Sequence, residues 1–133
     1  MALPTLQLIP RHMNSPIDEI RNAGADDVLV AITFTPYSRD TIEACKYAQS
    51  KGMKLILNSD SDFVVPELTP EVTLIASTLS THYFGTFTGA MAVVESLIAI
   101  LVARGGDDAR ERINAYEDLR NEIDAYWRPV KKQ

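Results

Sequence analysis

A hydroxyl-rich turn at residues 33–38 (Thr-Phe-Thr-Pro-Tyr-Ser) is the segment of this chain best suited to hold an anion. An unbroken apolar run precedes it and an amphipathic stretch follows it, so the turn joins a predicted buried strand to a predicted helix N-terminus. A helix N-terminus offers unpaired backbone N–H groups and a positive dipole end, to which Thr33, Thr35 and Ser38 add hydroxyls. This combination predicts a phosphate site without a metal. Alternatively, Ser38 merely caps the helix and the threonines make local turn bonds.

Two further polar segments also follow predicted strands. They are residues 58–62 (Asn-Ser-Asp-Ser-Asp) and residues 77–82 (Ser-Thr-Leu-Ser-Thr-His). In parallel α/β folds, ligands bind beyond the carboxyl ends of the strands. We therefore expect all three segments to share one edge of a sheet, with Ser80, Thr81 and His82 contacting the part of the ligand beyond its phosphate.

Strand and helix signals alternate along the chain, which predicts a three-layer α/β/α fold with a mostly parallel sheet of four strands. The run at residues 28–32 has no polar residue, so we expect burial on both of its faces. Residues 6–8 alternate in polarity between prolines and predict a short edge strand. The whole chain, residues 1–133, is predicted to be one domain that ends in a long helix. Strands are predicted at residues 6–8, 28–32, 55–57 and 72–76, and helices from Asn14 or Ser15 to Ala23 and at residues 39–51, 87–103 and 107–127.

Composition narrows the possible functions. The chain has 133 residues, 46% of them hydrophobic, and a net charge of −5, which gives no general attraction to nucleic acid or to anionic membranes. The single cysteine, Cys45, excludes an intrachain disulfide and a cysteine-rich zinc site. The N-terminus lacks the features of a signal peptide, and the apolar residues 87–103 are too few to span a bilayer. A cytoplasmic protein is the expectation.

Several residues have both a functional and a structural interpretation. Glu95 lies in the apolar helix, where it is either a catalytic base or a buried or interfacial carboxylate with a hydroxyl or basic partner. Asp60 and Asp62 lack the rest of a calcium loop, and no metal or cofactor is expected. Cys45 is predicted to be a core residue. The aromatic residues of the last helix are interpreted as packing or dimer contacts: Tyr116, Tyr126 and Trp127.

The segment 28–41 resembles the S-x-S-G-x-T phosphosugar motif of sugar isomerase (SIS) domains, especially those of RpiR-type bacterial transcription regulators. Residues 55–61 resemble that family's strand with a T-D-S type ending, and the resemblance extends over nearly the whole chain. It implies a SIS, flavodoxin-like fold, with phosphate held by Thr33, Thr35 and Ser38. Pro36 replaces the motif glycine, which removes one backbone N–H.

A second departure concerns the start of the domain. SIS domains normally open with a strand and a G-x-G-x-S loop, and neither these nor a helix-turn-helix precedes the first strand here. The family's strand order leaves the vacant place between residues 6–8 and the strand at 28–32. We expect either that residues 6–9 move into this place or that chains associate to complete the sheet.

The resemblance implies a phosphosugar-binding sensor domain of an RpiR-family regulator. Such a domain acts as a homodimer or higher homo-oligomer, and only a separate N-terminal domain contacts DNA. The alternatives are a small aldose–ketose phosphosugar isomerase with Glu95 as its base, and a truncated domain that binds ligand weakly.

Overall fold

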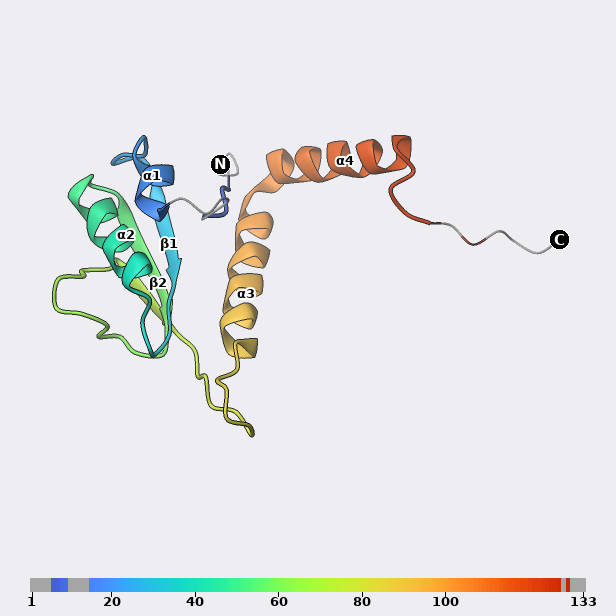
Figure 1. Cartoon of the computed structure of the whole chain (residues 1–133). Coiled ribbons are helices and arrows are strands. Elements are labelled where there is room, and N and C mark those ends of the chain that lie inside the picture. The colour runs from blue at the N-terminus through green and yellow to red at the C-terminus, as the bar shows by residue number, and fades with distance from the viewer. Residues whose placement is uncertain (1–5, 10–14, 128, 130–133) are drawn as a thin grey trace. The chain divides into compact units, whose positions relative to one another are not determined.

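The computed structural model describes residues 6–9, 15–127 and 129, which divide into two compact units (Figure 1). The first unit, residues 6–96, contains the sheet and the beginning of α3. The second unit contains the rest of α3 and α4, and is considered separately below. The elements in chain order are α1 (Pro16–Ile20), β1 (Val28–Ile32), α2 (Arg39–Ser50), β2 (Lys54–Ser59), β3 (Val72–Ile75), α3 (Thr88–Arg104) and α4 (Gly106–Glu122).

The three strands form one parallel sheet in the order β1-β2-β3. Ile32 of β1 is level with Asn58 of β2, which is level with Leu74 of β3, so the carboxyl ends of the strands coincide. The alternation of strand and helix thus gives the predicted parallel α/β fold.

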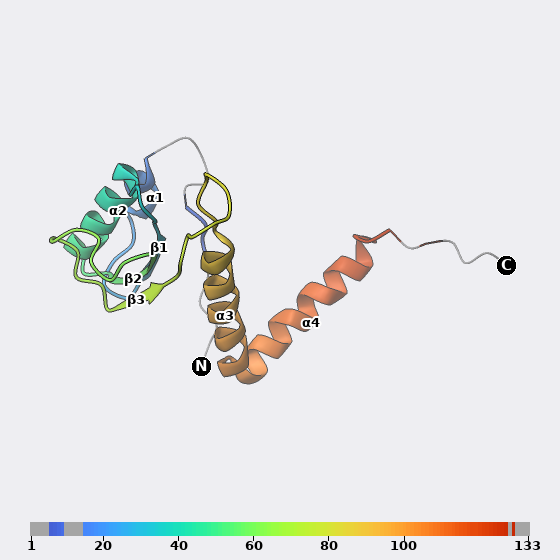
Figure 2. The same ribbon diagram turned by 90° about the horizontal axis from the view of Figure 1, so that it is seen from below.

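One face of the sheet is well covered. In Figures 1 and 2, α1 and α2 lie on the same side of the strands. Leu55 and Leu57 point to this side and pack with Ile42 and Cys45 of α2 and with Leu68 of the long β2–β3 connection. The predicted limits of α2 are nearly correct, because Gly52 follows it in a left-handed conformation (φ 77°) that favours glycine.

The opposite face is covered much less. Val28, Val30 and Ile32 alternate along β1 on this side and remain 51%, 39% and 49% exposed. The prediction that this strand is buried on both faces is therefore wrong. An unbroken apolar run shows only that neither face of the strand carries a polar residue. It does not show that a second layer of helices covers the other face of the sheet. α3 contributes Ala90, which packs with Phe34 and Ala76 near the carboxyl end.

The predicted fourth strand is not formed. Residues 6–8 are not in the sheet, and Leu6 and Leu8 are largely exposed. The flanking prolines have no N–H groups, which leaves this short segment few donors for a ladder. The expectation that residues 6–9 fill the vacant place is therefore wrong as well; Ile9 packs instead near Ile20. Asn14, one of the two predicted caps of α1, lies outside the described residues, and Ser15 makes no side-chain cap bond.

The second unit is helical. α4 ends at Glu122, five residues before its predicted end, because Asp124 adopts a left-handed conformation (φ 49°). Within the described residues, no single helix is long and apolar enough to cross a membrane. α3 and α4 pass that test only as a pair, by length and composition, and the pair is bent by 110°.

Candidate functional site

The carboxyl edge of the sheet is built from backbone hydrogen bonds that continue the strand ladders. The N–H of Thr33 donates to the carbonyl of Asn58 over 3.0 Å, and the N–H of Ala76 donates to the carbonyl of Ser59 over 2.9 Å. Thr33, Asn58 and Ser59 are all buried. This edge therefore fixes where the turn at residues 33–38 and the segment at residues 58–62 begin, and it brings them together as predicted.

Asp60 connects these two segments. Its Oδ2 accepts a hydrogen bond from the backbone N–H of Thr35 (3.2 Å), and its Oδ1 accepts one from the hydroxyl of Tyr37 (3.1 Å). The hydroxyl of Ser59 also donates to Oδ1, over 3.3 Å. The turn thus binds an anionic group of its own chain, in the place where the sequence predicts phosphate.

The electrostatics of Asp60 agree with this geometry. Desolvation alone raises the pKa of its carboxyl group, but hydrogen bonds from the side chain and backbone of Thr35 and from Tyr37 outweigh it and lower the pKa below the ordinary 3.8. The carboxylate is therefore ionised at neutral pH. Any phosphate that binds to the same donors must displace this negative charge.

The predicted phosphate-binding hydroxyls differ in their exposure. Thr33 is buried at the strand end, whereas Thr35 and Ser38 are exposed. Ser38 is the N-cap residue of α2, but its side chain makes no cap hydrogen bond. Ser38 therefore occupies the predicted cap position without the predicted side-chain bond, and the choice between a cap and a phosphate ligand stays a prediction. The Thr35–Pro36 peptide bond is cis.

The third polar segment, residues 77–82, belongs to a long loop that projects from the sheet edge before α3 (Figure 1). Its hydroxyls make local bonds: Ser77 accepts from the N–H of Leu79, and Ser80 accepts from that of His82. Among the described residues, no hydrogen bond joins this loop to the turn at residues 33–38. A role for Ser80, Thr81 and His82 in binding sugar stays a prediction. His82, expected at the start of the apolar helix, lies six residues before it.

The beginning of α3 closes the edge from the uncovered side of the sheet. The side-chain amide of Asn58 donates to the carbonyl of Ala90 over 3.0 Å, while its buried Oδ1 has no partner among the described residues. Gly89 allows this approach, because a Cβ atom there would lie 3.2 Å from the carbonyl oxygen of Ser77. Asn58 therefore joins the strand end to the helix, and its Oδ1 remains able to accept a hydrogen bond.

The other candidate residues lie away from this edge or are inert. Glu95 is exposed on α3, and its proposed role as a base stays a prediction. Cys45 is fully buried, and burial raises the pKa of its thiol to about 11, as expected for a core cysteine. In the described part of the chain, no group of three acidic, histidine or cysteine side chains is placed to hold a metal ion.

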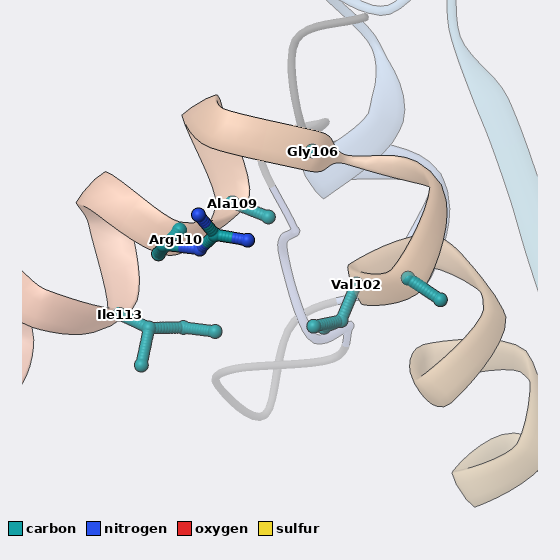
Figure 3. Close-up of a pocket in the computed structure, with 6 residues that line it drawn as sticks. Val102, Gly106, Ala109, Arg110 and Ile113 are labelled. Atoms are coloured by element: carbon teal, nitrogen blue, oxygen red, sulfur yellow. The ribbon is translucent and has the colours of Figure 1, made fainter.

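A shallow hollow lies in the second unit, where α3 meets α4 (Figure 3). It contains none of the predicted site residues, and its wall is largely apolar. The hollow is lined by Val102, Ala103, Gly106, Ala109, Arg110 and Ile113.

Sequence reasoning missed Asp60 as a hydrogen-bond partner of the turn at residues 33–38. The only signal for Asp60 in the sequence was a carboxylate directly after a buried strand.

Comparison with known proteins places this edge in a wider context. No protein-family profile matches the chain, and no curated protein matches it in sequence. Among solved structures, it is similar to the sugar isomerase domain of the RpiR transcription factor from Sphaerobacter thermophilus, with a TM-score of 0.67 and 24% sequence identity. The similarity covers 76% of this chain and 56% of that one, so this chain spans little more than half the length of its match. The chain therefore has the fold of a sugar isomerase domain, as the resemblance implied.

Proposed function

We propose that this chain is the phosphosugar-sensing domain of an RpiR-type transcription regulator, and that it binds a sugar phosphate at the turn of residues 33–38. The domain acts in the cytoplasm through self-association, and contact with DNA belongs to a separate domain. The observation that carries the proposal is the bond between this turn and the Asp60 carboxylate, because the same donors that hold a carboxylate suit a phosphate oxygen.

Binding proceeds by exchange of one anion for another. The phosphate takes the N–H and the hydroxyl of Thr35 and the hydroxyl of Tyr37 as Asp60 leaves, and the exposed hydroxyl of Ser38 provides a further donor. Pro36 contributes no N–H, so side-chain hydroxyls supply a larger share of the contacts than in the family motif. Release of Asp60 moves the segment after β2, which gives ligand binding a route to the rest of the domain.

Thermal-shift measurements test the proposal with a panel of hexose and pentose phosphates, each paired with its unphosphorylated sugar. We expect a rise in Tm only with phosphate esters, and we expect Thr35→Val to remove most of it. Asp60→Asn removes the competing charge and should strengthen binding by roughly tenfold or more, since like charges in contact cost more than 1.4 kcal/mol.

Asp62→Asn is the matched control, because Asp62 is an exposed neighbouring carboxylate that does not bond to the turn. It removes the same charge from the chain and should change affinity little. A ligand-induced shift that survives Thr35→Val would locate the site elsewhere. No shift with any phosphate ester, even for Asp60→Asn, would instead favour a domain that keeps the fold without the ligand.

A further inference from the structure

α3 is apolar around its whole circumference, yet only one side of it is covered. Ala90 is buried and Val93, Val94, Leu97 and Leu101 are half-buried; at 100° per residue, these positions form one face of the helix. A helix that is apolar all round is normally buried all round. The outer side of α3 therefore lacks a partner in the described chain.

The outer side of α3 carries one charge in a regular apolar row. Met91, Ile98 and Val102 are 60%, 46% and 39% exposed, and Glu95 lies between the first two. Successive members are four, three and four residues apart, which is the spacing of the contact line between two paired helices. We call these four residues the α3 stripe.

α4 carries a row of the same kind with the opposite charge. Ile113, Tyr116 and the C-cap residue Ile123 are 45%, 60% and 65% exposed, with Arg120 between the last two. The guanidinium of Arg120 lies 4.2 Å from the Tyr126 ring centre, and its Nη1 is 3.1 Å from Glu117. These contacts hold Arg120 at the row, which we call the α4 stripe.

The two stripes are complementary when the helices run antiparallel. With Glu95 opposite Arg120, Met91 is level with Ile123 and Ile98 is level with Tyr116. Val102 is then level with Ile113, so each apolar position meets another apolar position. Antiparallel packing also aligns the helix dipoles favourably.

Within one chain this pairing is not possible. Only Gly105 lies between α3 and α4, and this connection is too short for the two helices of one chain to lie antiparallel along their lengths. A two-fold axis between two copies removes this restriction, since it brings α3 of one copy against α4 of the other and the reverse at the same time.

We propose that two copies of this chain associate through these stripes, with Glu95 of each copy paired with Arg120 of the other. The six exposed apolar side chains of the stripes, with neighbouring Leu119 and Tyr126, offer at most on the order of 800 Å² per chain if each supplies roughly 100 Å². A standard interface buries about 800 Å² per partner. The proposal specifies the surface for the self-association in the proposed function and is independent of ligand binding.

Charge reversal tests the pairing in sedimentation-equilibrium runs over a range of concentrations. We expect the wild-type chain to dimerise, and we expect Glu95→Arg and Arg120→Glu each to weaken the dimer roughly a hundredfold, because like charges then meet at both contacts. Glu111→Arg is the control, since Glu111 lies on the opposite side of α4. Circular dichroism establishes that each variant keeps its helices.

Mixing the two single variants gives the decisive result. In the mixed dimer, each contact again joins an Arg to a Glu, so affinity should return to within about tenfold of wild type. Failure of the mixture, with rescue only in the double variant, would show that the contact lies within one chain. A monomeric wild type, or singles that dimerise normally, would also overturn the proposal, while phosphate-ester binding would remain a separate measurement.

Discussion

The helices α2 and α3 have similar apolar content on their inner sides but differ in what surrounds them. α2 packs on β1 and β2, and its buried residues, Ile42, Ala44, Cys45 and Ala48, are completed by the sheet and the β2–β3 connection. α3 has a single buried residue, Ala90. An amphipathic helix can bury its apolar face against one neighbour, whereas a helix that is apolar all round needs a second neighbour to bury its other side.

Thiol labelling provides the largest expected contrast between the two helices. Cys45 on α2 is fully buried with a pKa of about 11, while Ala99 lies on the exposed side of α3. In Ala99→Cys, we expect the new thiol to react with a disulfide reagent at the rate of a free cysteine. Cys45 should react at least roughly a hundredfold more slowly at pH 8, because two pKa units lower its thiolate fraction by that factor.

The pH dependence follows from the direction of this shift. The folded state holds the Cys45 proton more tightly than the unfolded state, whose thiol has an ordinary pKa of 9.0. This contribution to stability is present below pH 9 and is lost as the pH rises towards about 11. Equal labelling rates for both thiols would mean that α2 is not covered as described.

Truncation of an isoleucine on each helix tests the same contrast by stability. Ile42 on α2 is 7% exposed and Ile98 on α3 is 46% exposed. We expect Ile42→Ala to lower the free energy of unfolding by about 2–5 kcal/mol, because it leaves a cavity. Ile98→Ala should cost less than about 1 kcal/mol at low protein concentration.

Urea unfolding followed by circular dichroism measures both changes. If a second copy covers α3, the cost of Ile98→Ala grows as the protein concentration rises, because the variant loses the stabilisation that association gives. A large cost at low concentration would show instead that the chain covers this face by itself.

Elements with strong local signals could be predicted from the sequence. The limits of α2 follow from the three-residue spacing of Ile42, Cys45 and Ala48 and from the glycine that ends the helix, all within one segment. The place of the turn follows from the apolar run before it. These signals depend on the backbone and its nearest neighbours, so they survive without knowledge of the rest of the fold.

Features that depend on distant contacts could not be predicted. Asp60 joins the turn through Thr35, which is 25 residues earlier in the chain. The exposed face of β1 reflects a missing layer, which the composition of Val28–Ile32 does not reveal. The position of His82 was misjudged because a polar loop extends further before α3 than its hydroxyls suggest. In each case the deciding partner lies elsewhere in the chain or beyond it.

The glycines that follow α2 and α3 provide the smallest expected difference in the free energy of unfolding. Gly52 (φ 77°) and Gly106 (φ 58°) both adopt left-handed conformations that strain any other residue. Gly52 is fixed between α2 and β2, because its N–H donates to the carbonyl of Gln49 and the next N–H donates to that of Ala48. Gly52→Ala should therefore lower the free energy of unfolding of the sheet by about 1–2 kcal/mol.

Gly106→Ala introduces the same strain at the junction of α3 and α4, where no atom lies within 4 Å of the added Cβ. The sheet core does not depend on this dihedral angle, so urea unfolding of the sheet should change by less than about 0.5 kcal/mol. The junction does connect the two stripes of one chain, so the same variant should weaken the dimer in sedimentation runs. Equal losses of sheet stability in both variants would show that the bend is part of the sheet's own folding unit, and would remove the contrast between the two helices.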